Sequence, residues 1–199
     1  MKKNKNKKIA NDVIDLEILA LKKLRKSINN SFNQAVDAIV KCQSKTILCG
    51  VGKSGHVASR IAASLSSVGS PSFALSASDC SHGDLGSITN NDCILVVSNS
   101  GQSYELNDVI NYAKRFNIPL LSITSNKKGL LYLKSDYSIL FKKPIEACPL
   151  NLAPTSSTTM TLMIGDAIAI TLLKMRGFKK SNFSKFHPGG NIGKDLVKL

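Results

Sequence analysis

The sequence predicts an α/β fold: a three-layer αβα domain on a doubly wound, parallel, five-stranded sheet, with an N-terminal helical arm. Two observations predict it. Short apolar runs alternate with helix-length segments along most of the 199 residues, which is the order that builds a parallel sheet covered by helices. One run, residues 92–98, is continuously apolar between Asp92 and Ser98, as expected of a central parallel strand. The length suits one domain, so we expect a basic disordered tail at residues 1–8 and a single domain at residues 9–199.

Residues 9–42 are predicted to be helical. Ile14, Ile18, Leu21 and Ile28 share one face and form part of a wide apolar stripe. A break at residues 27–31 is expected to divide the region into two helices. Because the stripe is so broad, we expect this arm to pack against a partner subunit as well as against its own domain.

The remaining elements alternate between strand and helix. Strands are predicted at residues 46–51, 72–75, 92–98, 119–124 and 138–141, and helices at residues 52–68, 103–116 and 155–175. The last helix is apolar nearly all round, which indicates a buried or interface position. Its apolar run, residues 160–173, is short and contains Asp166, so we expect no transmembrane helix.

Charge and cysteine content limit the setting but not the function. The formal net charge is +14, and five of the first eight residues are lysine. A solvated tail and an attraction for anionic partners both explain this charge. The five cysteines form no C-x-x-C pair, a pattern typical of a reduced compartment. No apolar segment follows the basic start as it would in a signal peptide, and we therefore expect a cytoplasmic protein.

A glycine-rich loop follows the first predicted strand, at the edge of the sheet where ligands bind in such folds. Residues 50–55 match G-x-G-x-x-G. A dinucleotide site also requires an acidic residue after the second strand, where this chain has Ser76, and a Walker A loop requires a glycine where it has Ile47. What remains is an anion site at a helix N-terminus, with Gly52, Lys53 and Ser54 as binding residues. A solvent-facing lysine is the alternative for Lys53.

A serine-rich loop follows the third predicted strand. Ser98, Ser100 and Ser103 lie within six residues, and Glu105 follows on the next predicted helix. One serine is enough to cap a helix, so three hydroxyl groups favour a phosphate cradle made of short donors and backbone amides. For Glu105 a simple interaction with the helix dipole is the alternative.

Six motifs give the chain a specific resemblance. They are G-x-G-K-S-G-H at 50–56, S-H-G-D-L-G at 81–86, S-N-S-G-x-S-x-E-L at 98–106, E-A-C-P-L-N-L-A-P-T-S-S-T-T at 146–159, G-D-A at 165–167 and H-P-G-G-x-I-G at 187–193. In this order they resemble the arabinose-5-phosphate isomerases, which are built on the sugar-isomerase (SIS) domain. The resemblance covers residues 10–199.

The resemblance implies a cofactor-free interconversion of D-ribulose 5-phosphate and D-arabinose 5-phosphate through an enediol, serving Kdo and lipopolysaccharide synthesis. Such a reaction requires a base, a proton relay and positive charge for the enediolate. The positions that matter catalytically in the family fall on Lys53, Glu105, Glu146 and His187. Glu146 or Glu105 is expected to be the base, His187 to assist ring opening or relay a proton, and Lys53 to hold negative charge.

The resemblance also implies substrate contacts from His82 and from Gly69 and Ser70. His82 is alternatively a cap of the turn that follows it, and the hydroxyl run 155–159 is alternatively only an N-cap cluster. The family is dimeric or tetrameric, so we expect a homo-oligomer with a sugar phosphate as partner and with no nucleic acid and no membrane. The late position of His187 makes it a candidate to serve a neighbouring subunit.

The chain departs from the family in two respects. A histidine associated with metal binding in relatives is Ser76 here, so we predict no metal site. Many relatives continue into paired CBS domains, and regulation through such domains is not expected of the chain as given. Two alternatives to the isomerase stay open: a non-catalytic SIS module that senses a sugar phosphate, and a different phosphosugar isomerase.

Overall fold

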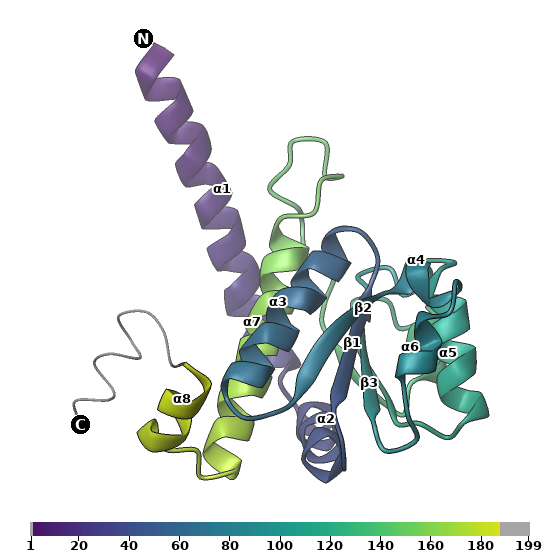
Figure 1. Cartoon of the computed structure of the whole chain (residues 1–199). Helices are drawn as coiled ribbons and strands as arrows, with labels where there is room; N and C mark the ends of the chain where they lie inside the picture. Colours follow the sequence, from purple (N-terminus) through teal and green to yellow (C-terminus); the bar gives the residue numbers. More distant parts are fainter. Residues whose placement is uncertain (1, 188–199) are drawn as a thin grey trace.

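The computed structural model describes residues 2–187, with side chains from residue 5 onward (Figure 1). Five parallel strands form one sheet in the order β2-β1-β3-β4-β5. Their bounds are β1 Thr46–Gly50, β2 Ser72–Ser76, β3 Cys93–Val97, β4 Leu120–Thr124 and β5 Tyr137–Leu140. The predicted fold is confirmed, because apolar runs of this length are central strands that helices bury on both faces.

The point where the strand order reverses lies between β1 and β3. These two strands pair in register, with Gly50 opposite Val97 at their carboxyl ends. β2 lies on the outer side of β1, and β4 lies on the outer side of β3. In a doubly wound sheet the loops that leave two such strands separate to opposite faces and open a crevice. The glycine-rich and serine-rich loops begin at this point.

Each face of the sheet carries its own helical layer (Figure 1). One layer contains α1 (Lys2–Leu24), α2 (Asn30–Lys41), α3 (Lys53–Ser67) and α7 (Ser156–Met175). It packs on alternate strand residues such as Leu48, Leu95 and Val97. The other layer contains α4 (Ala77–Cys80), α5 (Leu106–Arg115) and α6 (Leu130–Lys134) and packs on the intervening residues, among them Ile94 and Val96. The alternation follows from the two-residue repeat of a strand.

Three short elements complete the described chain: the 3-10 turns η1 (Arg25–Ser27) and η2 (Asp84–Ser87), and the helix α8 (Lys180–Phe186). The turn η1 and the bend after it separate α1 from α2, so the break predicted at residues 27–31 is confirmed. The pieces α4, α6 and α8 were not predicted. They span four, five and seven residues, which is too short to leave a clear helical periodicity.

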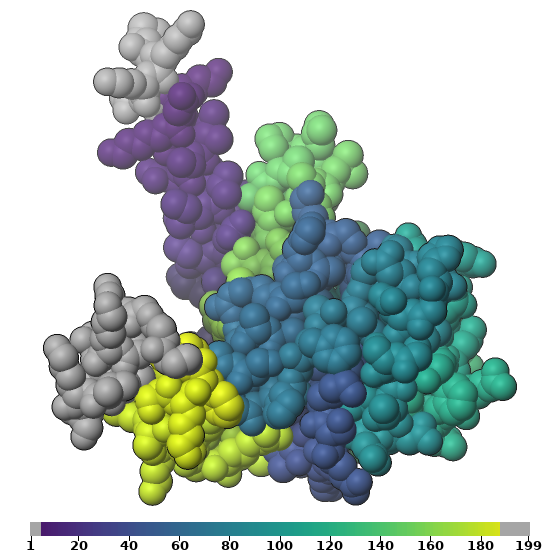
Figure 2. Space-filling view, viewed as in Figure 1, coloured from purple at the N-terminus to yellow at the C-terminus, as the bar shows by residue number. Residues whose placement is uncertain are grey.

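The N-terminal arm differs from its prediction. We expected disorder through residue 8, but α1 begins at Lys2. Lysine favours a helix, and no glycine or proline interrupts this stretch. The arm projects beyond the body of the domain, and the loop that precedes α7 projects beside it (Figures 1 and 2). Ile9, Ile14 and Ile18 on α1 are largely exposed, so much of the predicted apolar stripe is uncovered in a single chain.

The helix α7 lies in the core layer between α3 and α1. Its buried side includes Met160, Ile164 and Ile168. Gly165 lets the two helices approach closely, because a side chain there would collide with Ile61 of α3. Among the described residues, α7 is the one helix long and apolar enough to cross a membrane, and half of that apolar stretch is buried within the domain. A core helix meets the same criterion.

Candidate functional site

The glycine-rich loop runs from the end of β1 into α3, which begins at Lys53. A side chain at Gly50 would lie 2.9 Å from the backbone of Ser54 and Gly55, so glycine is required for strand and helix to meet. Gly52 has a φ of +56° and open space beside it. Lys53 and Gly52 are exposed at the helix N-terminus and Ser54 is half-buried, so the loop presents a cation and backbone groups to an anion.

The serine-rich loop folds back on itself. The buried Ser98 hydroxyl accepts a hydrogen bond from the Gly101 amide at 3.0 Å, and the exposed Ser100 hydroxyl accepts one from the Gln102 amide at 3.3 Å. Ser103 is half-buried, and its carbonyl accepts the Leu106 amide. The helix α5 therefore begins at Leu106, three residues later than predicted, because a turn at residues 103–106 precedes it. The loop is a small cradle rather than a simple helix cap.

The first turn of α7 meets both loops. A cleft of about 50 Å³ is lined by Ser54 of α3, Asn99 of the serine-rich loop and the α7 residues Ser157 and Thr158, with apolar residues around them. The N-termini of α3 and α7 thus converge beside the serine-rich loop. Two helix N-termini and several hydroxyl groups in one cleft favour a bound anion.

Glu146 lies in the segment between β5 and α7 and does not itself line the cleft, but it is hydrogen-bonded to Ser157, which does, and only 8% of it is exposed. Its Oε2 accepts hydrogen bonds from the Thr155 amide (2.8 Å), the Thr155 hydroxyl (3.1 Å) and the Ser157 amide (3.2 Å). Burial works to raise its pKa, but hydrogen bonds from Ser157 and Thr155 outweigh burial and hold the pKa below its ordinary value of 4.5. Glu146 is therefore an ionised carboxylate at the N-terminus of α7.

The hydroxyl run that begins α7 is more than a cap. Thr155 occupies the N-cap position, yet its hydroxyl accepts no hydrogen bond from the helix backbone. Glu146 takes that role, and the Thr155 hydroxyl bonds to it. Sequence reasoning missed Thr155, because its hydroxyl and those of its neighbours resemble an ordinary cap cluster. Ser156 adds a buried hydroxyl without a hydrogen-bond partner, the one such side-chain atom among the described residues.

Glu105 and His82 lie at the same carboxyl edge of the sheet but on other elements. Glu105 is half-buried, directly precedes α5 and makes no capping hydrogen bond. His82 is exposed in the turn after α4. Its backbone amide, rather than its ring, bonds to the carbonyl of Asp79 at 2.8 Å. Neither side chain lines the 50 Å³ cleft.

The structure does not bring Gly69, Ser70 and His187 to this cleft within one chain. Gly69 and Ser70 follow the far end of α3, a helix of 15 residues that spans about 22 Å. There the Gly69 carbonyl accepts a hydrogen bond from Arg176, beyond the end of α7. His187 follows α8, also at this far end (Figure 1). The expected substrate contacts of Gly69 and Ser70 therefore stay a prediction, and within a single chain these residues lie away from the cleft. The family motifs identify these residues in the sequence, but they do not show at which end of the domain each residue lies.

His187 is held by contacts with the preceding helix, α8. Its ring stacks on Phe183 with a centroid distance of 3.8 Å, and Nδ1 lies 2.9 Å from the Phe183 carbonyl. The rest of the predicted 187–193 motif lies outside the described residues. For metals, the described residues contain no group of three or more His, Cys, Asp or Glu side chains that could hold an ion.

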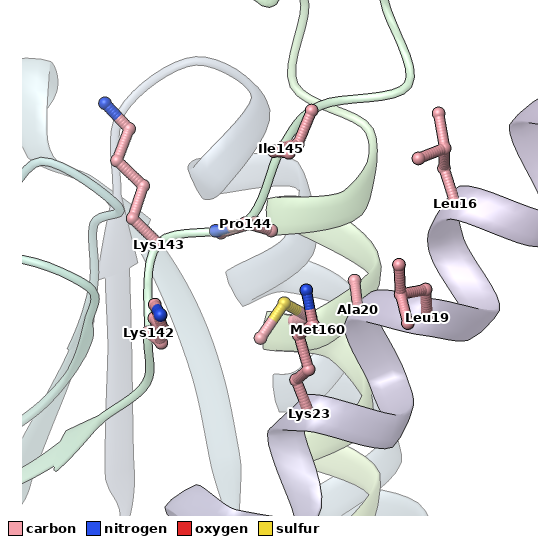
Figure 3. A pocket seen from close by; sticks show the side chains of 9 residues that line it. All are labelled: Leu16, Leu19, Ala20, Lys23, Lys142, Lys143, Pro144, Ile145 and Met160. Carbon is pink, nitrogen blue, oxygen red and sulfur yellow. The ribbon is translucent and has the colours of Figure 1, made fainter.

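A larger hollow, of about 200 Å³, lies between α1 and the segment that joins β5 to α7 (Figure 3). Its lining combines apolar residues, among them Leu16, Ala20 and Met160, with the lysines Lys23, Lys142 and Lys143. In Figure 3, Lys143 points away from α1. None of the predicted site residues lines this hollow, whereas Ser54 lines the cleft between α3, α7 and the serine-rich loop, so we take that cleft as the candidate site.

The class of protein that the structure defines is a doubly wound α/β domain with hydroxyl-rich and glycine-rich loops at its switch point. Comparison with protein families is more specific: the SIS domain model matches residues 39–171. The chain belongs to the SIS-domain family.

Individual proteins similar to this chain are named for a sugar phosphate or have one bound. Over 185 residues the chain is 44% identical to "Arabinose 5-phosphate isomerase KdsD" of Yersinia pestis and 43% identical to the protein of that name from Francisella tularensis. The alignments cover 93% and 92% of this chain but 56% and 57% of the relatives, so the chain spans just over half their length. A solved Escherichia coli CFT073 protein in complex with arabinose 5-phosphate superposes with a TM-score of 0.91 at 31% identity, covering 94% of this chain and 100% of that one.

Proposed function

We propose that the chain is an aldose–ketose isomerase that interconverts D-ribulose 5-phosphate and D-arabinose 5-phosphate through an enediol. The observation that carries this proposal is the cleft where two helix N-termini meet the serine-rich loop, with the ionised carboxylate of Glu146 hydrogen-bonded to Ser157 of the cleft lining. An anion cradle beside a carboxylate is what a phosphorylated sugar that loses a carbon-bound proton requires. The names of the similar proteins support the same choice of substrate.

In the proposed reaction each part of the cleft has one task. The serine-rich loop and the N-terminus of α3 hold the phosphate, and Lys53 stabilises the enediolate. A carboxylate, Glu146 or Glu105, removes the proton from one of C1 and C2 and returns it to the other, while protons move between the two oxygens. The overall change is an internal redox exchange between C1 and C2, so no cofactor is required. His82 contacts substrate from the α4 side.

We further propose that the active protein is a homo-oligomer in which His187 serves the site of a neighbouring subunit. His187 lies at the opposite end of α7 from Glu146 in its own chain, and a helix of 20 residues spans about 30 Å. The exposed apolar face of α1 supports an assembly as well. We expect mixed oligomers of His187→Ala and Glu146→Ala subunits, each inactive alone, to recover part of the activity. Mixtures that stay inactive would contradict the sharing of His187.

The product of this reaction would supply Kdo and lipopolysaccharide synthesis in the cytoplasm. A direct conversion assay tests the function. Purified protein is incubated with ribulose 5-phosphate, with glucose 6-phosphate and sedoheptulose 7-phosphate as control substrates, and the sugars formed are separated and identified. We expect arabinose 5-phosphate from ribulose 5-phosphate alone. Binding of the sugar phosphate without turnover would favour the non-catalytic sensor, and turnover of a control instead would favour another phosphosugar isomerase.

A further inference from the structure

The segment before α7 is closed into a loop by contacts around Glu146. The Glu146 amide donates to the Asn151 side chain at 2.8 Å, and the Ala147 amide donates to the Thr155 hydroxyl at 2.8 Å. Thr155 returns two hydrogen bonds, from its amide and its hydroxyl, to Oε2 of Glu146. The loop therefore fixes both the backbone and the carboxylate of Glu146.

These contacts are unequally divided between the two carboxylate oxygens. All three hydrogen bonds that the described residues donate to the carboxylate reach Oε2. Oε1 accepts none of these three hydrogen bonds. Oε2 is therefore the anchored oxygen.

We propose that Thr155 is a positioning residue for Glu146 in the isomerisation: its hydroxyl anchors Oε2 and so directs Oε1 to the sugar phosphate. This rests on the proposed function. Thr155 does not need its hydroxyl to begin α7, because the capping hydrogen bonds come from the amides of Thr155 and Ser157. The Thr155 hydroxyl accepts a hydrogen bond from the Ala147 amide and donates one to Glu146. It therefore holds the carboxylate in place and makes no hydrogen bond to the backbone of α7.

A titration readout depends on the charges around Glu146. The neighbouring elements carry Glu17 on α1, which accepts a hydrogen bond from Thr159, the lysines Lys142 and Lys143 before Glu146, and Lys53 at the start of α3. None of these side chains bonds to Glu146 within the described chain, and substitution of Thr155 leaves all of them in place. The loss of one donor to an ionised carboxylate raises its pKa, so we expect Glu146 to titrate at higher pH.

The test compares Thr155→Val, which has nearly the same shape but no hydroxyl, with Thr155→Ser, which keeps it. Steady-state kinetics on arabinose 5-phosphate are measured from pH 3 to 9, so that the acid limb lies within the range, and melting curves confirm that each variant folds at each pH. Removing a hydrogen bond to a charged group is worth about a tenfold effect or more. We expect Thr155→Val to lower kcat about tenfold with KM within about twofold, and to move the acid limb of the kcat profile to higher pH. Thr155→Ser should recover at least half of the lost activity.

Three results overturn the proposal: unchanged kcat and acid limb in Thr155→Val, equal impairment of Thr155→Ser, or a change in KM alone. If Thr155→Val does not fold, Thr155→Ala is compared with Thr155→Ser in the same way. NMR titration of the 13C-labelled Glu146 carboxyl, assigned with Glu146→Gln, is independent of turnover. Unchanged titration in Thr155→Val refutes the contact even if the wild type is active. A wild type that forms no product refutes the proposed function, whatever the titration shows.

Discussion

Two buried carboxylates, one at each end of the sheet, are held by hydrogen bonds in different ways. Asp92 lies before β3 at the amino end and is 2% exposed; Glu146 lies at the carboxyl end and is 8% exposed. Asp92 uses both oxygens: Lys45 Nζ lies 3.1 Å from Oδ1 and 3.0 Å from Oδ2, and the Thr89 amide lies 2.7 Å from Oδ2. Glu146 has no cationic partner in the described chain and uses only Oε2.

The difference separates a structural carboxylate from one available for chemistry. Asp92 is saturated, and its contacts tie the start of β1 to the start of β3. Burial works to raise its pKa, but hydrogen bonds from Thr89 and Lys45 keep the pKa below its ordinary value of 3.8. Similar donors lower the pKa of Glu146, but the three hydrogen bonds from Thr155 and Ser157 reach only one of its oxygens, an arrangement that suits the proposed exchange of a proton with a ligand.

The largest effect is expected on activity from Glu146→Gln. The amide keeps the shape and an oxygen that can accept from Thr155 and Ser157, but it cannot accept a proton. Loss of a general base lowers the rate of the chemical step by about 10²–10⁴-fold. We therefore expect kcat to fall about a thousandfold, with a small change in melting temperature. Kinetics and thermal melts of the same preparation measure both. Near-normal turnover would remove Glu146 from the catalytic set.

A smaller effect, on stability rather than on kcat, is expected from Asp92→Asn. The amide of this variant lacks the charge that pairs with Lys45, at a cost of about 2 kcal/mol in the free energy of unfolding. Because folding lowers the pKa of Asp92, its contribution is present above about pH 4 and is lost as pH falls below that value. Denaturant unfolding at pH 7 and pH 3 should therefore show a larger difference between variant and wild type at pH 7 than at pH 3.

The control for that comparison is activity. At 25 °C the folded Asp92→Asn variant should turn over substrate within about twofold of wild type, because the substitution lies at the other end of the strands from the cleft. A stability loss that is equal at both pH values, or a kcat as low as that of Glu146→Gln, would erase the distinction between the two carboxylates.

The sequence predicted the sheet far better than the site. Runs such as the one predicted at residues 92–98 are too apolar to be anything but buried, and the observed strand, Cys93–Val97, lies within one residue of it at each end. The glycine-rich and serine-rich loops were also found, since strand order places them at one edge. The start of α5 was missed because Ser103, Tyr104 and Glu105 are as compatible with a helix as with the turn they form.

The sequence could not show which of the candidate site residues lie close together in space. The family motif assigned Gly69, Ser70 and His187 to the site, but the length of α3 and α7 carries them to the opposite end of the domain. Thr155 was missed for the opposite reason: its hydrogen bond joins it to Glu146, nine positions earlier in the sequence. Only coordinates distinguish that contact from an ordinary helix cap.

The measurement that tests the central claim most directly is NMR of ribulose 5-phosphate incubated with the protein in deuterated water. An enediol pathway passes the carbon-bound proton through a base that exchanges with solvent. We predict that arabinose 5-phosphate forms with deuterium at C2, and that Glu146→Gln abolishes most of this conversion while Asp92→Asn preserves it. If no arabinose 5-phosphate forms with the wild-type chain, the assignment of this site to aldose–ketose isomerisation is contradicted.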